Sequence, residues 1–110
     1  MSATLNLDVA AHEALSLDEM AAIGNRAVEL HCRVRIRDTG TRLRSWTIFV
    51  TSWALRDGEP VCTVAEKFHS GHLADLVSGM LDQYVEAFAA WTPTELATVA
   101  AQSGLPVTRA

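Results

Sequence analysis

An apolar stripe at helical spacing runs through residues 70–91. Its members recur every three or four positions, which is the spacing of one helix face, and they are Leu73, Leu76, Val77, Met80, Leu81, Tyr84, Val85 and Phe88. The pattern predicts about five turns of amphipathic helix. Because such a helix must bury its apolar face against another layer, the rest of the chain has to supply that layer.

Three segments before this helix have the composition of β-strands. In residues 30–37 every second residue is apolar, and a period of two predicts a half-buried strand. Residues 42–55 are rich in β-branched and aromatic side chains, which favour strands. Residues 61–69 follow the hairpin signal Asp57-Gly58 and form the third candidate. We expect a three-stranded antiparallel β-meander with the long helix packed on one face.

Two further helices are predicted from capping signals. Residues 16–19 read Ser-Leu-Asp-Glu, a capping box, and the helix that it begins is expected to end near residues 24–26. A second signal, Thr-Pro-Thr-Glu, predicts a short helix over residues 92–101. Residues 1–15 are either a short helix or an extended arm, and residues 104–110 are a tail. The expected fold is α+β, in the order α-β-β-β-α-α.

Length and composition are those of one globular domain, residues 1–110. Hydrophobic residues make up 49% and charged residues 20% of the chain, a balance unlike that of disordered proteins. No apolar run reaches the roughly 18 residues of a membrane span, and the N-terminus lacks the features of a signal peptide. We therefore expect a cytoplasmic protein, not associated with a membrane, in which Cys32 and Cys62 remain thiols.

Charge is distributed unevenly along an acidic chain of net charge −4. Five of its nine cationic residues are arginines within residues 31–44, namely Arg33, Arg35, Arg37, Arg42 and Arg44. The first three alternate with apolar residues and are expected to point away from the long helix; the last two lie on one face of the next strand. Residues 68–108 contain no lysine or arginine, and Asp75, Asp82 and Glu86 occupy the polar side of the long helix. Opposite charge on two surfaces favours electrostatically steered binding.

Aromatic residues of the second strand bear on the same question. Without a bulge, Trp46 points opposite to Phe49 and Trp53. One helix covers only one sheet face, so aromatic side chains on the other face need a cover. Either the N-terminal helix or a partner could provide it. Because tryptophan and arginine dominate interface energetics, the predicted partner-binding set comprises the five arginines, Trp46, Trp53, Asp75, Asp82 and Glu86.

Two other classes of function have some support. The order α-β-β-β-α is similar to that of double-stranded-RNA-binding domains, which would make the arginines a nucleic-acid site. Those domains resemble one another in a lysine cluster at the start of the last helix, where this chain has His69, His72 and Asp75 instead. These three residues could themselves bind a metal or ligand, but His-x-x-His alone matches no specific metal spacing. Cys32 and Cys62 are better explained as strand packing residues than as nucleophiles.

The sequence contains no catalytic, nucleotide-binding or metal motif, so we predict no cofactor. It favours a non-enzymatic protein-binding module that also forms a homodimer. In size and charge alone the chain is similar to small acidic inhibitor proteins of phages and mobile elements, anti-CRISPR proteins among them. The alternatives that remain are a nucleic-acid-binding regulator that uses the arginines, and a small enzyme or ligand binder that uses His69 and His72.

Overall fold

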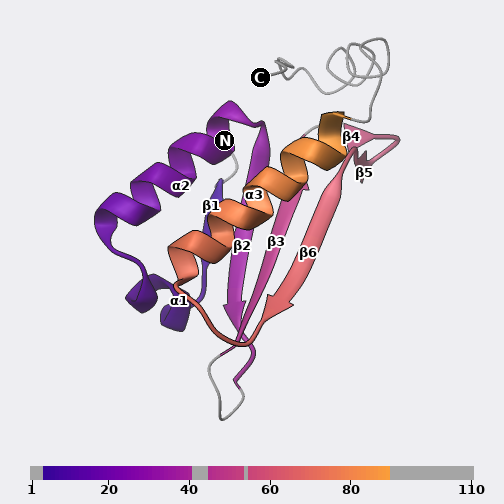
Figure 1. The fold of residues 1–110 in the computed structure, drawn as a ribbon. Coiled ribbons are helices and arrows are strands. Elements are labelled where there is room, and N and C mark those ends of the chain that lie inside the picture. The colour runs from indigo at the N-terminus through magenta and orange to yellow at the C-terminus, as the bar shows by residue number, and fades with distance from the viewer. Residues whose placement is uncertain (1–3, 41–44, 54, 90–110) are drawn as a thin grey trace.

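The computed structural model describes residues 4–40, 45–53 and 55–89 and shows a mixed α+β fold (Figure 1). In chain order the elements are β1 (Leu5–Leu7), α1 (Val9–Ala14), α2 (Leu17–Glu29), β2 (Cys32–Asp38), β3 (Trp46–Ser52), β4 (Leu55–Arg56), β5 (Glu59–Pro60), β6 (Thr63–Phe68) and α3 (Leu73–Ala89). The predicted α+β class is confirmed, with an N-terminal helix and a long C-terminal helix packed on the sheet. Among the residues described, no helix has both the length and the apolar character needed to cross a membrane.

The main sheet has four strands in the order β1-β2-β3-β6. β3 is antiparallel to both of its neighbours, β2 and β6, so the predicted meander is matched, but only in part. The unpredicted strand is β1, which pairs parallel with β2 and sets Leu5 opposite Val34 and Leu7 opposite Ile36. Parallel neighbours need a crossover connection, and α1 and α2 provide it. The N-terminal segment, expected to be either an arm or a helix, thus contains both a strand and a helix.

The predicted start of α2 is confirmed by its capping box. The hydroxyl oxygen of Ser16 accepts a hydrogen bond from the backbone N–H of Glu19 at 3.1 Å, and the Glu19 carboxylate accepts one from the N–H of Ser16 at 2.9 Å. These contacts satisfy two N–H groups that a helix start leaves without partners.

The predicted end of α2 is wrong, because the helix continues to Glu29. Gly24 costs the helix about 1 kcal/mol relative to alanine, but the buried residues Ile23 and Ala27, before and after it, keep the helix on the sheet. The chain leaves the helix at His31, whose φ of 53° is left-handed. Such a residue is a common helix stop, and it turns the chain into β2.

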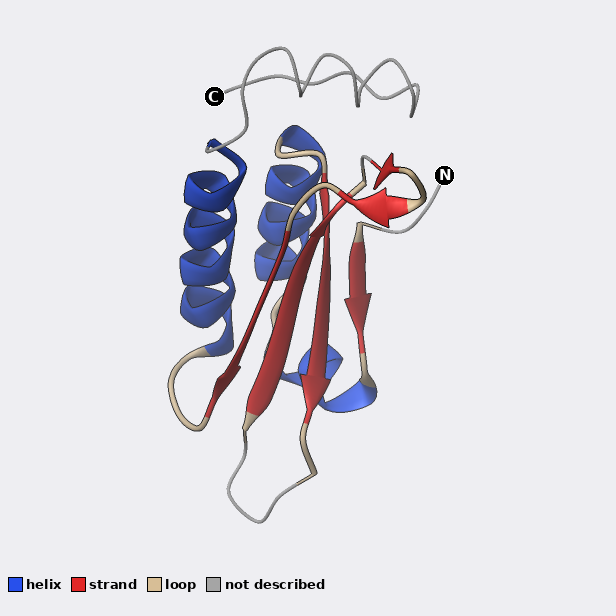
Figure 2. Cartoon of the chain, turned by 90° about the vertical axis from the view of Figure 1, so that its right-hand side faces the viewer, coloured by secondary structure: helices blue, strands red, loops and turns tan. Residues whose placement is uncertain are grey.

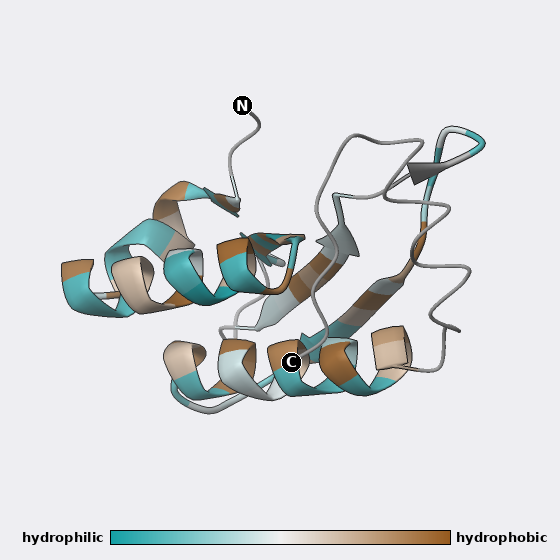
Figure 3. Cartoon of the chain, turned by 90° about the horizontal axis from the view of Figure 1, so that it is seen from above, coloured by the Kyte–Doolittle hydropathy of each residue, from teal (hydrophilic) through white to brown (hydrophobic). Residues whose placement is uncertain are grey.

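The core lies between one face of the sheet and a single layer formed by α2 and α3. α2 packs over β1 and β2, and α3 over β3 and β6, so both helices cover the same face (Figures 1 and 2). Both carry hydrophobic and hydrophilic bands, as Figure 3 shows from above. The largest fully buried apolar side chains come from the sheet and from α3, and they are Tyr84, Ile36, Ile48, Met80, Leu81, Val34, Val50 and Val77.

The predicted amphipathic character of α3 is confirmed. Six of the eight residues of its stripe are buried, including Met80, Tyr84 and Phe88. Leu76 was expected to be buried as well but is half-buried, because it lies on the flank of the stripe. The rings of Tyr84 and Phe88 stack with centroids 5.5 Å apart, which extends the packed contact along the last turns of the helix.

The Asp57-Gly58 turn signal is also confirmed. Asp57 and Gly58 have φ values of 54° and 84°, as a two-residue hairpin turn with two left-handed positions requires. They join β4 and β5, which form a separate two-stranded sheet. The predicted helix over 92–101, the tail at 104–110, and Arg42 and Arg44 lie outside the described residues.

Candidate functional site

The face of the main sheet opposite the helices carries three rows of side chains. Strand register aligns Arg33 with Thr51 and Thr63, Arg35 with Phe49 and Ala65, and Arg37 with Thr47 and Lys67. We call these nine residues the arginine face. Because α2 and α3 both pack on the other side, neither of these helices covers it. The helix predicted from the capping box, α2, therefore does not provide the cover that the sequence left open.

The charge of the arginine face has one sign among the described residues. Arg33, Arg35, Arg37 and Lys67 are exposed cations. The acidic residues of the same strands, Asp38 and Glu66, are opposite Trp46 and Ile48 and so point to the helix side. Since cations are concentrated on one side of a thin sheet, the local potential is positive although the whole chain is acidic.

An aromatic ring lies at the centre of this face. The guanidinium carbon of Arg35 stands 4.5 Å from the centroid of the half-buried Phe49 ring. A cation over a ring face is held by the ring quadrupole, so Arg35 has a preferred orientation in the unbound protein. The contact leaves the N–H edges of the guanidinium available to a planar acceptor such as a carboxylate.

The two tryptophans of the predicted set have different surroundings. Trp46 is only 4% exposed and faces the helices, so a partner cannot reach its ring in this structure. The predicted opposite orientation of Trp46 and Phe49 is confirmed by the register. Trp53 follows β3 and is half-buried. Its ring and that of His31 pack edge to face, with their centroids 6.5 Å apart. Its buried Nε1 has no hydrogen-bond acceptor in the described part of the chain.

The acidic residues predicted on α3 are all exposed, but one of them has an internal role. Asp82 forms an ion pair with Arg26 of α2, whose guanidinium also donates to the hydroxyl of Ser78 at 3.4 Å. These contacts join the two helices, which leaves Asp75 and Glu86 as the acidic positions of α3 that a partner could use.

The helix layer as a whole is strongly acidic. Helices α1, α2 and α3 contain one cationic residue, Arg26, and seven carboxylates: Glu13, Asp18, Glu19, Glu29, Asp75, Asp82 and Glu86. The sequence predicted a basic sheet surface and an acidic helix surface, and the described residues place these charges on opposite sides of the molecule.

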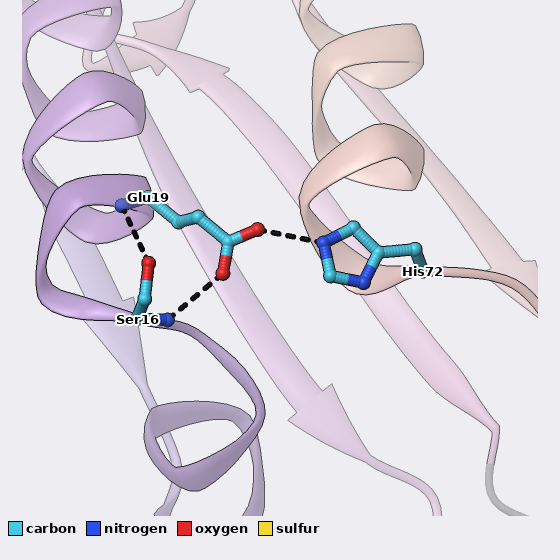
Figure 4. Close-up of polar contacts among 3 residues, drawn as sticks. All are labelled: Ser16, Glu19 and His72. Atoms are coloured by element: carbon cyan, nitrogen blue, oxygen red, sulfur yellow. Dashed lines mark hydrogen bonds and ion pairs between the residues drawn. The ribbon is translucent and has the colours of Figure 1, made fainter.

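His72 of the β6–α3 loop links the starts of α2 and α3. The Nε2 of His72 lies 2.6 Å from the second carboxylate oxygen of Glu19 (Figure 4). The Ser16 backbone N–H, and then the His72 contact, lower the pKa of Glu19. Glu19 thus serves the capping box of α2 and holds the start of α3 at the same time.

A cavity of about 430 Å³ adjoins this contact and is lined by Ala14, Trp46, His69, Ser70, Gly71, His72 and Leu73. It brings the two predicted ligand-binding histidines to one place. However, no group of three or more His, Cys, Asp or Glu side chains within the described residues could hold a metal ion. The cavity therefore has the shape of a small binding site without an evident set of ligands.

The cysteines are poor nucleophiles in this fold. Cys32 is fully buried in β2, and Cys62 is half-buried just before β6; both are free thiols. Burial raises the pKa of Cys32 to about 12 and also raises that of Cys62. Because the thiolate is the reactive form, both groups remain largely unreactive thiols near neutral pH.

Sequence reasoning missed part of the arginine face. Lys67 and the three threonines were not among the predicted residues, although Thr63, Ala65 and Lys67 alternate with period two in the sequence. That alternation could have shown that the three share a face. Which face they share depends on the β3–β6 register.

No protein-family model, curated protein or solved structure matches the chain. The function proposed below is therefore derived from the geometry of the arginine face.

Proposed function

We propose that this protein is a non-enzymatic binding module that docks an acidic surface of another protein through the arginine face. The observation that carries the proposal is the exposed set of Arg33, Arg35, Arg37 and Lys67 on a sheet face that α2 and α3 leave uncovered. Complementary charge guides association and fixes orientation. Side chains on the strands of a packed sheet are also held in a more precise geometry than side chains on loops.

The use of arginine supports recognition rather than simple solvation. Any polar residue would serve on an open sheet face, yet all the cations of β2 are arginines. The planar guanidinium can bind a carboxylate through two parallel hydrogen bonds, which lysine cannot do. Phe49 adds an apolar centre beneath Arg35, and aromatic and arginine side chains together are typical of the energetic centre of interfaces.

The charge pattern also bears on self-association. A two-fold symmetric dimer brings the same patch of both copies together. Through the arginine face, it would set four cations against the same four cations. We therefore assign this face to a different protein, and a homodimer, if formed, to another surface. Light scattering on the 11.9 kDa chain distinguishes monomer from dimer directly.

We place this activity in the cytoplasm, where a small protein of this kind would act by covering an acidic surface of a larger complex. Inhibitor proteins of phages and mobile elements are the class that the chain is similar to in size and charge. Single-stranded nucleic acid is the second candidate partner, because a basic sheet face with an aromatic residue is also a platform for such strands.

The test compares two variants of equal net charge in affinity capture from the protein's own host. Arg35→Gln with Arg37→Gln removes two cations from the arginine face. Asn25→Glu with Gln83→Glu adds two acids to exposed helix positions and changes the net charge equally. The proposal expects loss of the partner with the first variant only, and weaker wild-type capture at high salt. Equal recovery with both variants refutes it, and nuclease-sensitive recovery favours the second candidate.

A further inference from the structure

The arginines of β2 form a straight row with a fixed repeat. Arg33, Arg35 and Arg37 are exposed on one face of one strand. Alternate residues of a strand are about 6.6–6.8 Å apart, so the row presents three cations at that interval. Beside it on β3, Phe49 is in the centre, with Thr47 and Thr51 above and below. A ligand that binds all three arginines must carry negative charges at a similar interval.

We propose that the partner contributes an extended acidic segment, with carboxylates at alternate positions, that lies along β2 on the arginine face. The inference rests on the proposed function and specifies its ligand. Same-side residues of an extended chain repeat at about 6.6–6.8 Å, so each carboxylate can meet one arginine. A helix fits less well, since its same-face residues rise about 4.5–6 Å and turn progressively away from a flat surface.

Arg35 is the anchor of this arrangement. Its guanidinium already stands over the Phe49 ring, 4.5 Å from the centroid, so part of the ordering that binding requires is present in the free protein. Preorganised groups lose less entropy when a ligand binds. The middle carboxylate of the segment therefore meets an arginine that is already oriented by Phe49, and the outer two meet Arg33 and Arg37.

Recognition through the face is favoured over addition of a strand to the sheet edge. Within the described sheet, β6 is one edge strand and carries the exposed charged pair Glu66 and Lys67, which point to opposite faces. Charged residues on an edge strand oppose pairing with another chain. The other edge is β1, which has only three residues.

Two rival occupants fit the arginine face less well. Nucleic acid would need rings on which bases stack, and the one aromatic residue in the three rows, Phe49, is already covered by Arg35. A second copy could offer Asp75 and Glu86, but these are eleven positions apart, about 16 Å along a helix. Asp82 between them is paired with Arg26. The arginine row is shorter, about 13 Å.

The experiment uses the full chain and two short fluorescent peptides of identical composition. One has three glutamates at alternate positions among serines, and the other has them four positions apart. Fluorescence anisotropy at low salt measures binding of each peptide, and oligo(dT) serves as the nucleic-acid probe. We expect the alternating peptide to bind at least about fivefold more tightly than the other, since three registered ion pairs replace one or two. Asn25→Glu with Gln83→Glu should keep this preference, and Arg35→Gln should remove it.

The outcomes separate this inference from the proposed function. Equal affinity for the two peptides, with partner capture still lost in Arg35→Gln with Arg37→Gln, overturns the extended segment and leaves the acidic protein partner standing. Peptide binding and capture that are both insensitive to the arginines overturn both proposals. Tighter binding of oligo(dT) than of either peptide also overturns both, in favour of nucleic acid.

Discussion

Replacement of Arg35 by glutamine should leave stability almost unchanged, although it removes a contact from the centre of the sheet. The lost cation–π contact with Phe49, 4.5 Å from the centroid, contributes about 0.5–1 kcal/mol at an exposed site. Removing the charge also relieves repulsion from Arg33 and Arg37. At about 6.7 Å each pair costs about 0.6 kcal/mol in water, and physiological salt reduces this to about 0.3 kcal/mol. The opposing terms cancel to within about 0.5 kcal/mol.

Urea unfolding of the wild type and of Arg35→Gln, followed by circular dichroism, measures this difference. Equal slopes with a midpoint shift equivalent to less than about 0.5 kcal/mol would show that the arginine is dispensable for folding. The wild-type chain would then carry the arginine row for another purpose. A loss above about 2 kcal/mol would refute the reasoning, because it would mean that Arg35 stabilises the sheet in a way that its exposed position does not explain.

Three further predictions concern the scaffold. Met80→Ala, at a side chain 1% exposed, should cost about 2–5 kcal/mol of unfolding free energy in urea titrations; an unchanged midpoint would contradict the packing of α3 on the sheet. Ser16→Ala should cost about 1 kcal/mol in the same assay, since it removes the cap of α2, and Ser16→Thr should restore most of it. Because burial raises the pKa of Cys32 from 9.0 to about 12, its contribution to stability is complete below pH 9.0 and is lost as pH rises toward 12. Wild-type stability should therefore fall faster than that of Cys32→Ala across this range; parallel curves would refute the assignment.

The sequence predicted the direction of the β2 arginines because side chains alternate along any strand. Cys32, Val34 and Ile36 are apolar, so their neighbours had to face the other way whatever the turn. The amphipathic helix was predictable for a similar reason, since the stripe from Leu73 to Phe88 repeats over several turns.

Features that depend on contacts between distant segments could not be predicted. β1 has three residues, too few for a periodic signal, and it exists through its pairing with β2. The burial of Trp46 and the position of Lys67 on the arginine face follow from the registers of β3 with β2 and β6. Asp82 belongs to a solvated helix face by pattern alone, and its pairing with Arg26 requires α2 and α3 to pack side by side.

The most direct test of the central claim is nuclear magnetic resonance of the isotope-labelled protein as its captured partner is added. We predict that the side-chain N–H signals of Arg33, Arg35 and Arg37 shift first and that the shifts decrease as salt is raised. The backbone signals of Asp75 and Glu86, on the opposite side of the molecule, should remain in place. Shifts confined to these α3 positions, with the arginine signals unchanged, would contradict the account and assign binding to the acidic helix layer.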